Sequence, residues 1–168
     1  MDGISISPKE AAHAKEIYQG KLTIELLGEK LGHFAFKNLS DLDLRNCRIK
    51  EIDCFSSGDF RSLRRLNLDN NQISTIEPLL SLTSVKFLSL NNNRIEKLAG
   101  FDADPKTQIM FFPNLLECQL GFNLVSRMSE LGLSRFKTLK VLYLQGNKIA
   151  KVSGILFFQL LTRFLTIT

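Results

Sequence analysis

One pattern occurs five times in the same register along this chain, and it constrains the fold more than any other feature. Each copy reads L-x-x-L-x-L-x-x-N-x-I with a further apolar residue three positions later; the copies begin at Leu39, Leu63, Val85, Leu115 and Leu139. Alternating apolar residues predict a short strand, and self-similarity at a regular spacing predicts units that stack on one another. We therefore predict a solenoid with one parallel sheet, in which Leu66 and Leu68 and their equivalents point into a shared core.

The asparagine of the pattern lies where the chain turns out of each strand. Its side chain carries donors and an acceptor, so we expect it to pair with backbone groups that the turn leaves open. These residues are Asn71, Asn93, Asn123 and Asn147, with Cys47 in the corresponding place of the first copy. The next apolar residues, which should close the core, are Ile73, Ile95, Val125 and Ile149.

The copies are separated by 24, 22, 30 and 24 residues, and the extra length is expected on the convex side. The 30-residue spacing indicates an insertion within residues 100–114. Its Asp102 and Asp104 supply too few oxygens for calcium, which binds about six to eight, so we expect a solvent-exposed loop. Each return segment offers two more core residues: Phe55 and Phe60, Leu79 and Leu82, Phe101 and Phe112, and Leu131 and Phe136.

The N-terminal part divides into a helix and the start of the repeats. Residues 1–20 are expected to form a capping helix, opened by a capping box of Ser7 and Glu10, and residues 21–168 to form the repeat domain. Residues 21–38 are interpreted as a degenerate copy, with Ile24, Leu26, Leu31 and Phe34 in the core.

The last segment, residues 154–168, is apolar, and the repeat register explains this without a membrane. A truncated copy is expected from residue 161, with Leu161 and Phe164 in core columns. As a helix, residues 155–167 would span only ~20 Å, short of the ~30 Å hydrocarbon core of a bilayer. No complete C-terminal cap follows, so we expect an exposed edge strand that self-associates edge to edge.

Copies near 22 residues with I-x-x-[I/L] endings resemble the short intracellular leucine-rich-repeat subclass, over residues 21 to about 166. This subclass includes the regulatory subunit of type-one protein phosphatase, the spliceosomal A-prime protein and the axonemal outer-arm dynein light chain. The resemblance implies an α/β solenoid of horseshoe shape, which grips another protein on its concave sheet in the cytoplasm, nucleus or cilium. The 30-residue spacing and the missing cap look more like a fragment or isoform of a longer leucine-rich-repeat protein.

Three columns of variable residues flank the strand leucines, and we predict that they form the concave face. Because neighbouring strands lie about 4.8 Å apart, each column should be continuous. The central column, between the leucines, reads Glu25, Asp43, Asn67, Ser89, Gln119 and Tyr143. The preceding column reads Thr23, Asp41, Arg65, Phe87, Glu117 and Val141, and the following column reads Leu27, Arg45, Asp69, Asn91, Gly121 and Gln145.

Aromatic residues gather toward the end of these columns. Phe87, Val141 and Tyr143 lie there among polar groups, and aromatic anchors in a polar surround are typical of protein interfaces. We therefore predict that the concave face binds a protein or peptide, with this aromatic end as its centre. The residues of the predicted site are Phe87, Tyr143, Val141, Gln119, Glu117, Ser89, Asn67, Arg65, Asp43 and Arg45, with Phe122 and Leu124 on the rim.

A second surface, the basic edge, follows the asparagine column. It reads Lys30, Arg48, Gln72, Arg94, Leu124 and Lys148. Basic residues at such spacing attract phosphates or an acidic peptide. As an alternative function, the resemblance to the spliceosomal A-prime protein implies a ribonucleoprotein adaptor with RNA close by. We do not expect direct nucleic-acid binding, because no aromatic residues interleave the edge for base stacking.

Other classes of function find no support in the sequence. No catalytic, nucleotide-binding or zinc motif is present, and carboxylate pairs such as Asp41 and Asp43 are expected on an open sheet without a pocket. The cysteines Cys47, Cys54 and Cys118 follow no secretory signal, which favours thiols in a reducing, intracellular compartment. We therefore predict a non-enzymatic protein without cofactor, metal or membrane segment.

Overall fold

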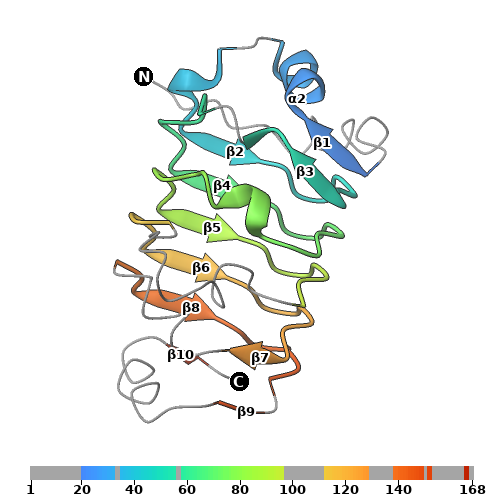
Figure 1. Cartoon of the computed structure of the whole chain (residues 1–168), viewed down its shortest axis with the longest axis vertical. Helices are drawn as coiled ribbons and strands as arrows, with labels where there is room; N and C mark the ends of the chain where they lie inside the picture. Colours follow the sequence, from blue (N-terminus) through green and yellow to red (C-terminus); the bar gives the residue numbers. More distant parts are fainter. Residues whose placement is uncertain are drawn as a thin grey trace, which may run out of the picture.

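The structure is a computed structural model, and it describes residues 20–32, 35–55, 58–96, 112–128, 138–149, 151–152 and 165–166. Within these ranges the repeats stack along the long axis of the molecule, each adding one strand to the strand before it (Figure 1). The strands of successive repeats pair in parallel. The predicted solenoid with a parallel sheet is therefore confirmed.

The main sheet of the described residues has the strand order β10-β8-β6-β5-β4-β2. Its strands are β2 (Asp41–Asp43), β4 (Arg65–Asn67), β5 (Phe87–Ser89), β6 (Glu117–Gln119), β8 (Val141–Tyr143) and β10 (Leu165–Thr166). From β2 to β8, the middle residues Leu42, Leu66, Leu88, Cys118 and Leu142 lie in one row and are buried. The flanking residues of each strand therefore share the opposite, open face.

Shorter elements lie where the repeats turn back. In Figure 1 two further strand pairs lie to the right of the main sheet: β1 (Lys21–Thr23) with β3 (Glu51–Asp53), and β7 (Arg127–Met128) with β9 (Lys151–Val152). The return segments also contain the 3-10 helices η1 (Phe36–Asn38) and η3 (Glu77–Leu79).

Helix α2 (Ile24–Leu31) follows β1 directly and covers the first repeat. At its N-terminus the Thr23 hydroxyl accepts a hydrogen bond from the Leu26 N–H at 3.4 Å. It ends at Gly32, whose φ of 70° is the left-handed conformation that glycine adopts at low cost.

Helix α2 lies where a strand was predicted, so the interpretation of residues 21–38 as a strand-forming copy is wrong in this respect. Leu22, Ile24 and Leu26 alternate as in a strand, but Ile24, Leu27 and Leu31 also lie one helical turn apart. Packing selects the helix, in which Leu27 is fully buried. The prediction that Thr23, Glu25 and Leu27 open the concave columns is therefore wrong, and the concave face begins at β2.

The core is one continuous cluster of apolar side chains enclosed by the sheet and the return segments. Leu66, Leu68 and the return-segment residues predicted inward are buried where the structure describes them. Phe60 stacks on Phe36 with ring centroids 5.1 Å apart and meets Phe55 edge-on at 4.8 Å. The predicted filling of the core from the convex side is confirmed for Phe55, Phe60, Leu79, Leu82 and Phe112.

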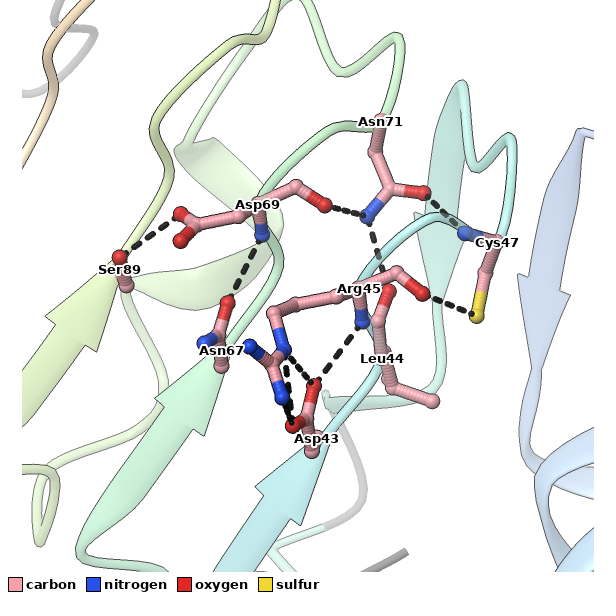
Figure 2. Close-up of polar contacts among 8 residues, drawn as sticks. All are labelled: Asp43, Leu44, Arg45, Cys47, Asn67, Asp69, Asn71 and Ser89. Atoms are coloured by element: carbon pink, nitrogen blue, oxygen red, sulfur yellow. Dashed lines mark hydrogen bonds and ion pairs between the residues drawn. The ribbon is translucent and has the colours of Figure 1, made fainter. Parts of the chain in front are cut away.

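The asparagines form a ladder that joins consecutive turns. Asn71 Oδ1 accepts hydrogen bonds from the N–H groups of Cys47 and Ile49, both at 3.0 Å. Its amide nitrogen donates to the carbonyls of Leu44 and Leu68, at 2.9 and 2.8 Å. Figure 2 shows Asn71 between Cys47 and Leu44 in the preceding turn. The predicted pairing with backbone groups is confirmed, and it recurs at Asn93, Asn123 and Asn147.

At the other end of the sheet, β10 pairs with β8 so that Leu165 lies opposite Leu142. The prediction that Phe164 occupies this row is wrong by one residue. The pattern was extended at a spacing of 22 residues, whereas the pairing of residue 142 with residue 165 needs 23. The run FLTI is apolar enough to fit either register, so the length of the return segment decides between them. Edge-to-edge association through this strand stays a prediction.

Several predictions concern residues outside the described ranges. They are the capping helix before Gly20, all but the last three residues of the segment 100–114 that contains the insertion, and the core roles of Phe34, Phe101, Leu131, Phe136 and Leu161.

Candidate functional site on the concave sheet face

Two of the predicted columns cross the open face of the main sheet as continuous rows. Most of these side chains are half-buried and Arg65 is exposed, whereas the residues between them are buried. Nine of the ten predicted concave residues lie in these rows, and Arg45 follows in the next column. The preceding column reads Asp41, Arg65, Phe87, Glu117 and Val141, and the central column reads Asp43, Asn67, Ser89, Gln119 and Tyr143.

Both arginines of this face are held in ion pairs. Two guanidinium nitrogens of Arg45 contact the Asp43 carboxylate: Nη2 lies 2.6 Å from Oδ2, and Nε lies 2.9 Å from Oδ1 (Figure 2). The hydrogen bond and the charge of Asp43 raise the pKa of Arg45 above its usual value. Arg65 Nη1 lies 3.4 Å from Asp41 Oδ1 in the neighbouring strand. Both pairs are partly open to solvent, so they orient the side chains more than they stabilise the fold.

Phe87 lies beside Arg65 in the preceding column. The guanidinium carbon of Arg65 is 4.9 Å from the centre of the Phe87 ring, which is a cation–π contact. On the other side of Phe87 in the same row comes Glu117. Its carboxylate accepts a hydrogen bond from Gln119 Nε2 at 2.7 Å. Among the described residues, no lysine or arginine nitrogen lies within 4.0 Å of Glu117.

A hydrogen-bonded network links the central and following columns across three strands. Asp69 Oδ1 accepts from the Ser89 hydroxyl and from the Asn91 N–H, both at 2.7 Å. The Asn91 amide nitrogen donates to Gln119 Oε1 at 2.9 Å, and Asn91 Oδ1 accepts from the Gly121 N–H at 2.8 Å. Figure 2 shows the start of this network at Asp69 and Ser89. The network therefore orders these side chains of the concave face.

The floor of the concave face has a shallow depression of about 260 Å³. Its polar and aromatic lining is Asp41, Asp43, Arg65, Asn67, Phe87, Ser89, Glu117 and Gln119. Asp41 and Asp43 themselves line this depression, so the expectation that they lie on a sheet without a pocket is wrong. Asp41 was placed in its column by the sequence but not assigned to the site.

The depression includes Phe87 but leaves out the rest of the aromatic end that the sequence singled out. Val141, Tyr143 and Arg45 do not line it, and neither do the rim residues Phe122 and Leu124. Val141 and Tyr143 are half-buried in β8, two strands beyond Phe87. Sequence order placed these residues on one face, but only the side-chain geometry separates the two regions.

The rim residue Phe122 has an unusual backbone conformation. It is 57% exposed, and its φ of 55° lies in the left-handed region, which costs a bulky residue more than asparagine or glycine. The equivalent residues of other repeats are Asn46, Asn70, Asn92 and Gly146. The Phe122 ring lies against Gly146, where an added Cβ would be only 2.5 Å from the ring.

From Arg48 onward the basic edge forms a row on the turns, whereas Lys30 lies in helix α2 and outside this row. Backbone hydrogen bonds connect Gln72 to Ile49, Arg94 to Ile73 and Lys148 to Val125, so these turns are stacked in register. Arg48, Arg94 and Lys148 are exposed. Among the described residues, no further contact favours phosphate binding there.

In the described part of the chain, metal-ligating side chains do not cluster, and two of the thiols are deeply buried. Within it no group of three or more histidine, cysteine, aspartate or glutamate residues is placed to hold a metal ion. Burial, followed by the negative charge of Glu117, raises the pKa of Cys118 to about 12, and burial also raises the pKa of Cys54. Both thiols are therefore protonated at neutral pH and poor nucleophiles. No helix among the described residues is long and apolar enough to cross a bilayer.

Comparisons with known proteins agree with this geometry. The family described as "Leucine Rich repeats (2 copies)" matches residues 37–81 and 61–103. Internalin C2 from Listeria monocytogenes has a similar structure, with a TM-score of 0.59 and 25% identity over 83% of this chain and 54% of the internalin chain. The fold is a leucine-rich-repeat solenoid. Leucine-rich repeats generally act as protein-interaction scaffolds, and they are typically non-enzymatic.

A curated relative matches a longer stretch of this leucine-rich-repeat chain. The human "Leucine-rich repeats and immunoglobulin-like domains protein 3" is 32% identical over 123 residues, which are 71% of this chain. The match spans 10% of that protein's length. The similarity therefore concerns the repeats and not the remainder of the relative.

Proposed function

We propose that this chain captures another protein or peptide on the concave face of its main sheet. The observation that carries the proposal is the two rows of half-buried and exposed side chains, held in strand register and not required by the core. A rigid sheet loses little conformational entropy when a partner binds, which favours affinity. The depression supplies a recess of about 260 Å³ for side chains of the partner.

Two regions would contact the partner in different ways. The depression around Phe87 offers charged and polar groups, while Val141 and Tyr143 offer apolar area further along the face. Phe122 extends the surface at the rim. An exposed phenylalanine in a conformation that asparagine occupies elsewhere costs stability without serving the core, which favours a role in contact.

Photo-crosslinking from single positions tests this proposal. Replacing Phe87 by p-benzoylphenylalanine puts the probe on the concave face, and replacing the exposed Glu77 puts the same probe on a return segment. We expect a discrete crosslinked protein from position 87 and none, or a different one, from position 77. The same probe at Tyr143 and at Phe122 covers the rest of the face. Equal labelling from positions 87 and 77, or no labelling from positions 87, 143 and 122, would refute a concave binding face.

We also propose an intracellular location, in line with the short intracellular subclass that the repeat length resembles. The three cysteines are buried in the core, where they pack as small apolar residues and require no oxidising compartment. Microscopy of cells that express the tagged protein, with a secretory and a ciliary marker, distinguishes the compartments. Accumulation in the secretory pathway would contradict the proposal.

A further inference from the structure

We infer that the depression on the concave face is a slot for an arginine side chain of the partner, bounded by the Phe87 ring and the Glu117 carboxylate. This inference rests on the proposed function and names the chemistry that the site selects. Both residues line the depression, and they are direct neighbours in paired strands β5 and β6. Neighbouring strands lie about 4.8 Å apart, so paired residues on one face stand side by side, which places ring and carboxylate within reach of one guanidinium.

The same row already contains one filled arrangement of this kind. Asp41, Arg65 and Phe87 follow one another in adjacent strands, and the Arg65 guanidinium both meets the Asp41 carboxylate and lies over the Phe87 ring. Beyond Phe87 the order continues with a carboxylate, Glu117, but with no cation of the described chain beside it. A planar guanidinium can stack on a ring and pair with a carboxylate at once, which a lysine ammonium does less well.

The charge of the surrounding face favours a cation over an anion. In the three columns the carboxylates are Asp41, Asp43, Asp69 and Glu117, and the guanidiniums are Arg45 and Arg65. Both guanidiniums are engaged in ion pairs, so an acidic partner would have to break them. Basic residues directly precede three of the strands, at Arg64, Lys86 and Lys140. The excess of negative charge is therefore confined to the floor of the concave face.

A hydrogen bond from Gln119 holds the Glu117 carboxylate in place for such a contact. Gln119 Nε2 donates to the Glu117 carboxylate at 2.7 Å, and Gln119 is itself joined through Asn91 to the backbone N–H of Gly121, two residues after β6. A carboxylate that is already oriented loses less entropy when it pairs with an incoming guanidinium. One oxygen of Glu117 is engaged by this hydrogen bond, and the other is available for the guanidinium.

Selection from a random dodecapeptide display library tests the slot. The library is panned on the wild-type protein, on Glu117→Gln, and on Glu96→Gln as a matched control at an exposed position outside the concave face. We expect peptides from the wild type and the control to share one arginine, and peptides from Glu117→Gln to lack this preference. Circular dichroism on each variant verifies that the substitution leaves the repeats folded.

A double-mutant cycle with one selected synthetic peptide then measures the contact. Replacing the shared arginine by glutamine should raise Kd at least tenfold for the wild type and for Glu96→Gln, but less than threefold for Glu117→Gln, because the two charges act as a pair. Phe87→Leu should raise the Kd of the arginine-containing peptide less than Glu117→Gln does, because it removes the ring but keeps the carboxylate.

The outcomes separate this inference from the proposed function. Selected peptides that share no basic residue, share an acidic one, or show no coupling with Glu117 would overturn the arginine slot and leave the concave binding face in place. Failure to select any peptide, together with the absence of crosslinks from the concave positions, would overturn both.

Discussion

Asn93 allows the contribution of the asparagine ladder to be measured at a single residue. Its Oδ1 accepts a hydrogen bond from the Ile73 N–H at 3.0 Å, and its amide nitrogen donates to the Leu68 and Leu90 carbonyls at 2.9 and 3.1 Å. The substitution Asn93→Ala removes these three bonds together with a longer one, at 3.3 Å, that the amide nitrogen donates to the Asn91 carbonyl. Ile73 is buried, so water cannot replace the acceptor without opening the turn.

The magnitude follows from which groups keep a second partner. Leu68 O also accepts from Asn71, and Leu90 O also accepts from Asn123, both at 2.8 Å. Each of these carbonyls therefore loses one bond worth about 1 kcal/mol, whereas a buried N–H left without an acceptor costs about 1–3 kcal/mol. We expect Asn93→Ala to lower the free energy of unfolding by about 4 kcal/mol, a large part of the roughly 5–15 kcal/mol of a typical domain.

Urea denaturation followed by circular dichroism measures this loss, and Asn92→Gly is the matched control. Asn92 precedes Asn93 directly, is exposed, and has a φ of 54° that glycine also adopts. The control should change the unfolding free energy by less than about 0.5 kcal/mol. Amide hydrogen exchange supplies a second readout, because protection should fall first at Ile73 and its neighbours in the turn. A loss below about 1 kcal/mol, or one equal to the control, would refute the reasoning.

Three further predictions concern the core, the rim and the aromatic end. The Cys118 thiol has a pKa of about 12 in the fold against 9.0 as its ordinary value, so its stabilising contribution is full below pH 9 and lost as the pH rises toward 12. Between pH 9 and pH 10 the wild type should lose about 1 kcal/mol more than Cys118→Ala in urea titrations, and equal losses would contradict the burial argument. Gly146→Ala should lower stability by about 1–2 kcal/mol, because the left-handed φ of 67° and the Phe122 ring both oppose a Cβ; adding Phe122→Asn should restore part of the loss in thermal unfolding, and no restoration would exclude the steric cause. Phe87→Ala with Tyr143→Ala should weaken partner binding at least tenfold while the circular dichroism spectrum stays folded, and undiminished binding would remove the aromatic end from the site.

The repeat pattern by itself determined the architecture of the main sheet. Leucines at alternate positions can face a common core only if the strands align in register. The row that contains Leu66 and its partners in neighbouring strands could therefore be predicted from the sequence alone. The asparagines were equally predictable, because a turn stacked on another turn leaves backbone groups that a side-chain amide can join. The same alternation placed the predicted residues of β2 to β8 on the concave face.

Tertiary structure decided what periodicity leaves ambiguous. Leu22, Ile24 and Leu26 fit a strand, whereas Ile24, Leu27 and Leu31 fit a helix. The open end of the first repeat selects the helix, which buries Leu27. The register of β10 depends on the length of a return segment and not on its apolar residues, which explains the one-residue error at Phe164.

The concave face shows the same division between sequence and fold. The order of the residues along its columns could be predicted from the sequence. Which charged side chains form ion pairs depends on distances between side chains in different strands. Arg65 reaches Asp41 and Phe87 only because parallel pairing places residues from three different repeats side by side. That neighbourhood leaves Glu117 beside an aromatic ring without a cation of the described chain, a relationship between residues 30 positions apart that no local pattern encodes.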